Sequence, residues 1–177
     1  MRFLAPASLL TLALAACVPS PKPATAPPPP PAAKPVPLPP APEPTGGWQD
    51  RPLSAGDWSY RPEQGGSVAL FGPPASEAAL TIRCDIAGYR ILVSRAGGPV
   101  ATGSGMTVRT TFGTVQWPAS NDGATIPHVV AARSAGDAAL DQIAFSRGRF
   151  AIEVAGLPML VAPAWPEVTR VIEDCRG

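Results

Sequence analysis

Apolar and polar residues alternate with a period of two through the middle of the chain, as they do in strands that bury one face. The side chains in such a pattern point alternately to the two faces of a sheet. The predicted strands cover residues 67–71, 78–86, 89–95, 106–112 and 128–132.

The alternation also assigns a face to each side chain. It places Val68 and Leu70 together on one face of the first strand. The residues expected to point inward from the next strand are Leu80, Ile82, Cys84 and Ile86. Those expected to point inward from the strand over 106–112 are Met106, Val108, Thr110 and Phe112.

Turn residues separate these strands and favour antiparallel pairing. Ala87-Gly88 lies between two predicted strands and indicates a hairpin. Further turns are expected at Gly72-Pro73-Pro74, Gly97-Gly98-Pro99 and Asn121-Asp122-Gly123.

The C-terminal part adds two helices. Asp137 is a suitable N-cap for a short helix, and a strand then puts Phe150, Ile152 and Val154 inward, with 159–161 pairing back against it. After Pro166, one apolar stripe is formed by Val168, Val171, Ile172 and Cys175. The fold is therefore predicted to be mostly β, with α+β as the alternative: a small antiparallel β-sandwich or curled sheet, with the C-terminal α-helix packed on it.

The N-terminus has the parts of a secretory signal over residues 1–16: Arg2, a short apolar run and small residues before Cys17. The apolar run is shorter than the roughly 20 residues that span a bilayer. Leu14-Ala15-Ala16-Cys17 resembles the lipobox of bacterial lipoproteins, which implies acylation of Cys17 and a lipid anchor. The alternative is an ordinary signal peptide with a chance cysteine. By the sorting rule of the lipoproteins that this lipobox resembles, Val18 and Pro19, in place of a retention aspartate, imply the outer membrane of the bacterial cell envelope.

Residues 17–47 form the lipidated cysteine and a proline-rich tether, with 14 prolines in the 26 residues from Pro19 to Pro44. Such a segment buries no core and is expected to be disordered or extended, as a spacer about 80 Å long. Docking of its prolines into a partner domain is the alternative. Residues 48–177 are then a single β-rich domain.

That domain has 11 Arg, no Lys and 12 Asp or Glu, so it is close to neutral. The balance excludes a strong nucleic-acid footprint. With Cys17 acylated, Cys84 and Cys175 are an even pair in an oxidising compartment, and each lies on an apolar face. A disulfide between them is expected, with a buried thiol pair or a metal site as alternatives.

The C-terminal third resembles uncharacterised lipoproteins and periplasmic proteins of alphaproteobacteria, especially sphingomonads. The resemblance lies in 144–150, 163–167 and 172–176, and the stretch 80–84 also fits. It implies the envelope location and the disulfide but no activity.

Arginines give the most suggestive candidate site. Arg147 and Arg149 flank Gly148 at a predicted turn, and Arg83 or Arg109 on the same sheet face would complete a site for an anionic group. The alternative is that these arginines pair with acidic residues such as Glu153 and fix the turn. Trp48, Trp58 and Trp165 form either an exposed aromatic platform or, as we favour, seals of the core.

Catalytic patterns are weak. A Ser-His-Asp arrangement requires the single histidine, His128, with Asp137 or Asp141 and a serine such as Ser104. A carboxylate pair for glycoside hydrolysis would use Asp85 and Glu153, which we expect instead in solvated ion pairs. We therefore assign no catalytic residue, metal site or cofactor.

The sequence predicts a non-enzymatic, membrane-anchored envelope lipoprotein. Acyl chains on Cys17 are expected to bind it to the membrane. Its domain is expected to have a binding or structural role, with an envelope polymer or a periplasmic protein as the partner. A periplasmic hydrolase or hydrolase inhibitor is the alternative.

Overall fold

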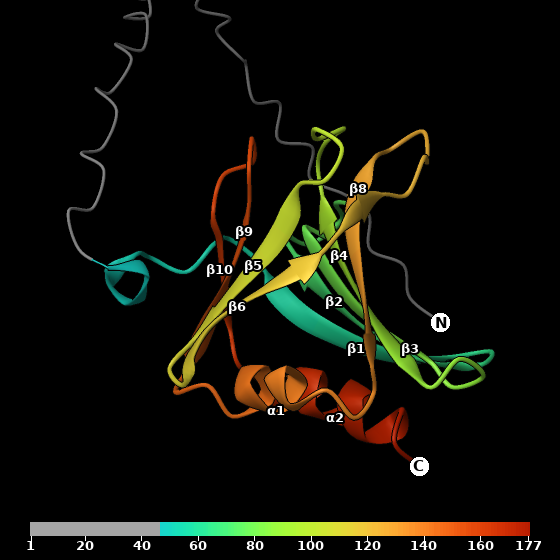
Figure 1. Cartoon of the computed structure of the whole chain (residues 1–177). Helices are drawn as coiled ribbons and strands as arrows, with labels where there is room; N and C mark the ends of the chain where they lie inside the picture. The colour runs from blue at the N-terminus through green and yellow to red at the C-terminus, as the bar shows by residue number, and fades with distance from the viewer. Residues whose placement is uncertain (1–46) are drawn as a thin grey trace, which may run out of the picture. The chain divides into compact units, whose positions relative to one another are not determined.

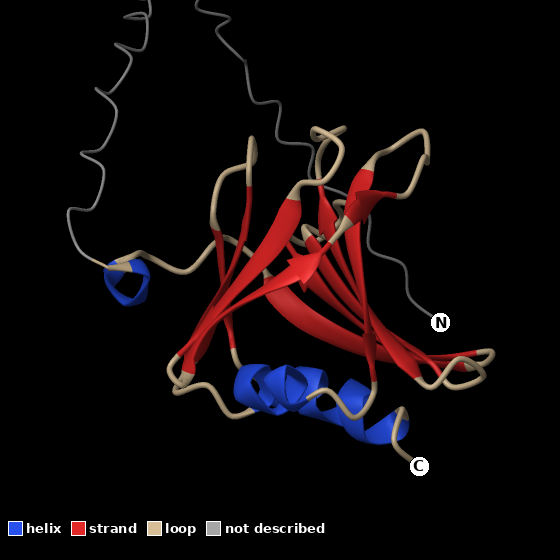
Figure 2. Ribbon diagram, in the orientation of Figure 1, coloured by secondary structure: helices blue, strands red, loops and turns tan. Residues whose placement is uncertain are grey.

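The computed structural model describes residues 47–177, and two antiparallel sheets with two α-helices make up this part of the chain (Figures 1 and 2). The prediction of a mostly β fold with antiparallel sheets and a C-terminal helix is confirmed. The predicted signal peptide, Cys17 and the tether as far as residue 46 lie outside the described residues. No helix within residues 47–177 is long and apolar enough to cross a membrane.

The larger sheet, which we call sheet A, has six strands in the order β1-β2-β3-β4-β8-β7. Strands β1 to β4 follow one another in the sheet and form a meander with antiparallel pairing, joined by short turns except for the longer loop between β2 and β3. The bounds are β1 Asp57–Glu63, β2 Gly66–Gly72, β3 Leu80–Asp85, β4 Arg90–Ala96, β7 Ser120–Asn121 and β8 His128–Ser134.

The smaller sheet, sheet B, has four strands in the order β10-β9-β5-β6. All its pairs are antiparallel as well. Its strands are β5 Gly105–Thr110, β6 Gly113–Pro118, β9 Arg149–Val154 and β10 Leu160–Pro163.

The two sheets enclose one hydrophobic core between their facing sides. The alternation predicted for β3, β5 and β9 is confirmed, because their inward residues are at most 4 % exposed. Burial of these side chains is the main stabilising contribution, at roughly 25 cal/mol per Å² of apolar surface. The largest fully buried side chains include Phe71, Leu80, Ile82, Met106, Trp117, Phe150 and Ile152.

Two helices close one end of the space between the sheets (Figure 1). Helix α1 (Ala138–Ala144) begins at Asp137, whose carboxylate accepts the Ala139 backbone N–H at 2.8 Å, so the predicted N-cap is confirmed. Helix α2 (Pro166–Asp174) buries the predicted stripe of Val168, Val171 and Ile172. A short 3-10 helix, η1 (Trp48–Asp50), precedes β1.

The Cys84–Cys175 disulfide is present and links β3 to the residue that ends α2, with 5.3 Å between the two Cα atoms. It closes a loop of 91 residues. In the chain-entropy model such a loop stabilises the fold by about 4–5 kcal/mol. The bond therefore fixes the C-terminal helix on the core side of sheet A.

Two inward assignments are wrong. Ile86, expected to continue the β3 stripe, is 54 % exposed, because the strand ends at Asp85 and the chain turns toward β4. Phe112 is 58 % exposed, because it lies in the tight turn between β5 and β6. In both cases the predicted alternation extends to one inward position beyond the end of the strand.

Val68 and Leu70 do share a face of β2, as predicted, but the structure places them on the side of sheet A away from the core. The core side of β2 is occupied by Ala69 and Phe71, which belong to the hydrophobic cluster between the sheets. Strand β2 is consequently apolar on both faces.

Candidate functional site

The side of sheet A that faces away from sheet B, its outer face, carries aliphatic side chains that neither helix covers (Figure 1). Leu70, Leu92 and Val130 are half-buried there, on three different strands. Val68 is fully buried, and in the register of the sheet it lies between Arg61 and Arg83. Long arginine stems can cover apolar neighbours in this way.

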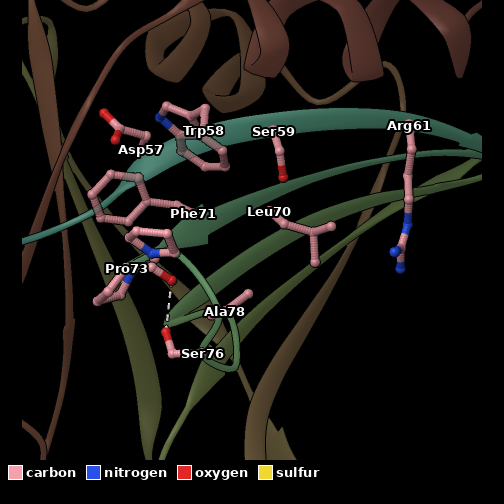
Figure 3. A pocket seen from close by; sticks show the side chains of 12 residues that line it. Asp57, Trp58, Ser59, Arg61, Leu70, Phe71, Pro73, Ser76 and Ala78 are labelled. Carbon is pink, nitrogen blue, oxygen red and sulfur yellow. Dashed lines mark hydrogen bonds between the residues drawn. The ribbon is translucent and has the colours of Figure 1, made fainter. Parts of the chain in front are cut away.

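A groove of about 420 Å³ lies at one end of this face, between β1, β2 and the loop that follows β2 (Figure 3). We call it the β1–β2 groove. Ser59, Leu70 and Arg61 project to the same side of the sheet (Figure 3). The loop supplies the opposite wall through Pro73, Pro74, Ala75, Ser76 and Ala78.

Two prolines and one hydrogen bond restrict the loop that forms this wall. Two successive prolines fix their own φ angles, and the Ser76 hydroxyl donates to the Pro73 carbonyl at 2.7 Å. Ala75 has φ +57°, in the left-handed region, which turns the chain back toward β3. The groove is thus formed before any ligand binds.

The groove has opposite charges at its two ends. Asp57 is exposed at the start of β1, and Arg61 is exposed four residues further on. Arg61 contacts Glu63 Oε1 through Nε and Nη2, both at 3.2 Å, and Glu63 also pairs with Arg83. Two cations therefore share one anion, and this end retains a positive charge. An apolar floor between opposite charges suits an extended polypeptide better than a phosphate group.

The four arginines predicted as candidates for an anion site do not form one cluster, although Arg109 and Arg149 share the outer face of sheet B. Arg83 lies on sheet A, whereas Arg109 and Arg149 lie on sheet B. Arg109 binds Glu153 at 2.8–2.9 Å. Arg149 donates to the backbone carbonyls of Gln49 and Arg51 at 3.1 and 2.8 Å, so it holds the segment that precedes β1.

Arg147 is the exception among these arginines. It is exposed in the turn between α1 and β9, and only its backbone N–H is bonded within residues 47–177, to Thr111 Oγ1 at 3.0 Å. The second interpretation, in which the arginines pair with acidic residues, therefore describes Arg83 and Arg109, whereas Arg149 is bonded to backbone carbonyls. A single exposed guanidinium is no built anion site.

The acidic partners that the sequence suggested for His128, Asp137 or Asp141, are wrong. The two ring nitrogens of His128 lie 2.9 Å from Asp122 Oδ2 and 3.3 Å from Glu77 Oε1. Asp137 and Asp141 pair instead with Arg133 and Arg176. No hydrogen bond joins His128 to a serine in the described part of the chain.

These contacts make a structural link rather than a nucleophile and base. The backbone N–H groups of His128 and Ala124 both donate to Asp122 Oδ1 at 3.1 Å. The His128 N–H, the Ala124 N–H and the His128 side chain lower the pKa of Asp122, because hydrogen bonds favour its charged form. Through Glu77, His128 also connects β8 to the loop beside the groove.

The two carboxylates considered for glycoside hydrolysis lie on different sheets. Asp85, on β3, accepts the Gly88 N–H and pairs with Arg90, and both contacts lower the pKa of Asp85. Glu153, on β9, pairs with Arg109. Within residues 47–177 there is also no group of three or more His, Cys, Asp or Glu residues able to hold a metal ion.

Of the predicted tryptophans, Trp58 seals the core and Trp165 lies at the surface. Trp58 is buried, packs against Phe71 with ring centroids 5.3 Å apart, and donates its indole N–H to the Pro163 carbonyl at 2.8 Å. Trp165 is 41 % exposed at the start of α2. Trp58 and Trp165 therefore do not form one exposed platform.

Reasoning from sequence did not find the β1–β2 groove. The available signal was the unbroken apolar run Val68-Ala69-Leu70-Phe71, although β8 and β10 contain apolar runs as well. Such a run marks a strand with two apolar faces. Comparison with protein-family models, with curated proteins and with solved structures finds no match to the chain.

Proposed function

We propose that the protein is a membrane-anchored lipoprotein of the bacterial envelope, and that its β domain is a non-enzymatic binding module. The partner is an extended segment of a periplasmic protein that lies in the β1–β2 groove. The observation that carries the proposal is this preformed groove, with its floor of Leu70, its proline wall and its oppositely charged ends.

Two features of the sequence support the envelope location. Leu14-Ala15-Ala16-Cys17 resembles a lipobox, and the proline-rich stretch that follows would hold a domain away from the membrane surface. The Cys84–Cys175 disulfide is in keeping with an oxidising compartment.

The binding proposal is tested with the full chain as bait in capture experiments from envelope extracts. Leu70→Asp places a charge on the groove floor, and Thr107→Asp places the same charge on the outer face of sheet B as the matched control. A partner protein that binds the wild type and Thr107→Asp, but binds Leu70→Asp at least tenfold more weakly, supports the proposal. A partner that binds both variants equally well contradicts a groove site, and capture of purified peptidoglycan alone contradicts a protein partner.

The anchor is tested separately by Cys17→Ser. We expect the variant to move from the membrane fraction to the soluble fraction, because the acyl chains supply the membrane affinity. Mass spectrometry of the wild-type N-terminus should show cleavage before Cys17 and added acyl groups. An uncleaved, unmodified N-terminus would remove the basis for the location.

A further inference from the structure

Strand β1 ends sheet A and pairs on one side only, with β2, among residues 47–177. A strand edge of this kind presents unpaired N–H and C=O groups to which another strand can bind. The edge of sheet B at β10 differs, because the Ser54 N–H bonds to the Val161 carbonyl at 2.8 Å and the Ser54 hydroxyl accepts the Val161 N–H at 3.0 Å.

Pro62 determines which groups of β1 are free. Proline has no N–H, so the Pro62–Ser67 pair cannot exchange two hydrogen bonds and is a non-hydrogen-bonded pair of the ladder. By alternation, the backbone groups of Trp58 and Tyr60 then also point away from β2. These two residues offer four backbone groups, two donors and two acceptors, at the free edge.

The side chains between them are complementary to themselves. Asp57, Ser59 and Arg61 share the outer face of β1, and all three are exposed. Asp57 accepts no hydrogen bond from residues 47–177, and Arg61 uses only Nε and Nη2 for Glu63, which leaves Nη1. An acid and a base therefore lie at equal distances on either side of Ser59.

We propose that two copies of the chain associate through their β1 edges, antiparallel, with Ser59 of each copy on the two-fold axis. This register sets Trp58 opposite Tyr60 of the second copy twice, which pairs all four free backbone groups. It also sets Asp57 opposite Arg61 of the second copy twice, as two cross-strand ion pairs. Isologous pairing of this kind is the commonest symmetry of soluble oligomers.

The neighbouring registers are worse. Centring on Tyr60 puts Pro62, which lacks a donor, opposite Trp58 and puts Asp57 opposite Glu63, two like charges. Centring on Trp58 puts Arg61 opposite Ala55 and leaves both charges unpaired. Only the register on Ser59 satisfies the hydrogen bonds and the charges together.

The association joins the two larger sheets edge to edge, with their outer faces on the same side. The two β1–β2 grooves then lie next to each other across the two-fold axis. Asp57 and Arg61 also carry the charged ends of the groove, so a bound polypeptide would compete for them. The dimer is therefore measured on purified chain without a polypeptide, and Leu70→Asp, which alters the groove floor and no residue of β1, separates failure of the groove proposal from failure of the dimer.

A cysteine placed at the two-fold axis tests the register in the full chain, purified from membranes in detergent. Opposed residues of a non-hydrogen-bonded pair have Cα atoms about 4.5 Å apart, which is within the range for a disulfide. Ser59→Cys should form a covalent dimer under air oxidation, whereas Thr81→Cys, on the same face but two strands inside the edge, should not. Wild-type protein gives the background from Cys17. No dimer from Ser59→Cys, or equal dimer from both variants, would overturn the proposal.

A charge exchange gives a second measurement. Arg61→Asp replaces two attractions with two repulsions, and we expect the dimer dissociation constant to rise about tenfold in analytical ultracentrifugation. The double variant Asp57→Arg with Arg61→Asp restores opposite charges and should return to within about threefold of wild type. A double variant as weak as the single one would contradict the pairing, provided circular dichroism shows both to be folded.

Discussion

The outer faces of the two sheets differ in what covers them. On sheet B, Ala151 and Val161 point away from the core yet are at most 2 % exposed. The segment before β1 runs past β9 and β10 and is held there by Arg149 and by the Ser54–Val161 bonds (Figure 1). On sheet A, Leu70, Leu92 and Val130 have no such cover from the described residues.

The difference shows how one sandwich can have a closed side and an open side. The chain uses its own N-terminal segment to bury the apolar residues of sheet B, so nothing remains there for a partner to gain. The aliphatic residues of sheet A are still half in water, and a partner that covered them would gain about 25 cal/mol per Å². Leu70 lies on the floor of the preformed groove, whereas Thr81 and Arg83 of β3 separate it from Leu92 and Val130, so the gain is greatest at the groove.

The largest expected effect on stability comes from removing the disulfide that holds α2 on sheet A. For Cys84→Ala with Cys175→Ala we expect a loss of about 4–5 kcal/mol in the free energy of unfolding, because the 91-residue loop no longer restricts the unfolded chain. Denaturant titration measures it, and reduction of the wild type should give a similar loss. A change below about 1 kcal/mol would show that packing alone holds α2.

Paired truncations compare the two outer faces directly. Val161→Ala should cost about 2 kcal/mol, because the site is covered and the lost methyl groups leave a cavity. Leu92→Ala removes more atoms from a half-exposed position and should cost less than about 1 kcal/mol. Equal losses in denaturant titration would mean that the two faces are covered alike.

Two arginines two residues apart test the clamp on sheet B. Arg149→Gln loses two hydrogen bonds to backbone carbonyls and should cost about 1 kcal/mol, with faster hydrogen exchange at the Ser54 and Val161 amides. Arg147→Gln removes the same charge from an exposed side chain with no bonded partner in residues 47–177 and should change neither quantity. Faster exchange in both variants would point to net charge rather than the clamp.

The sequence predicted the fold class, the disulfide and most of the inward residues, because each depends on local periodicity or on cysteine number. It missed β1, β6 and the two-residue β7. In β6 the alternation of Val115 and Trp117 spans only a few residues, and in β1 the proline at 62 weakens the pattern of Trp58 and Tyr60.

The groove and the arginine positions depend on which strands become neighbours in a sheet. The periodicity of a strand does not show its neighbours. Arg83 and Arg109 both lie on solvent faces of strands, as expected, but on opposite sheets. Arg149 is a candidate ligand-binding residue in the sequence, and its carbonyl partners, 98 and 100 residues away, have no signal there. Sequence patterns correctly assigned these side chains to the solvent faces of their strands. They could not show which sheet each strand joins.

The smallest expected effect concerns the contacts that Asp122 makes with the first residue of β8, His128. The pKa of Asp122 is lowered in the fold, chiefly by the His128 N–H, so its contribution to stability is fully present above the unfolded value of about 3.9 and is lost as pH falls through the folded pKa. Asp122→Asn removes this contribution at every pH. Melting temperatures from pH 6 to pH 2 should therefore show wild type above the variant near neutrality and the two converging in acid. A constant difference down to pH 2 would mean that the carboxylate acts through shape rather than charge.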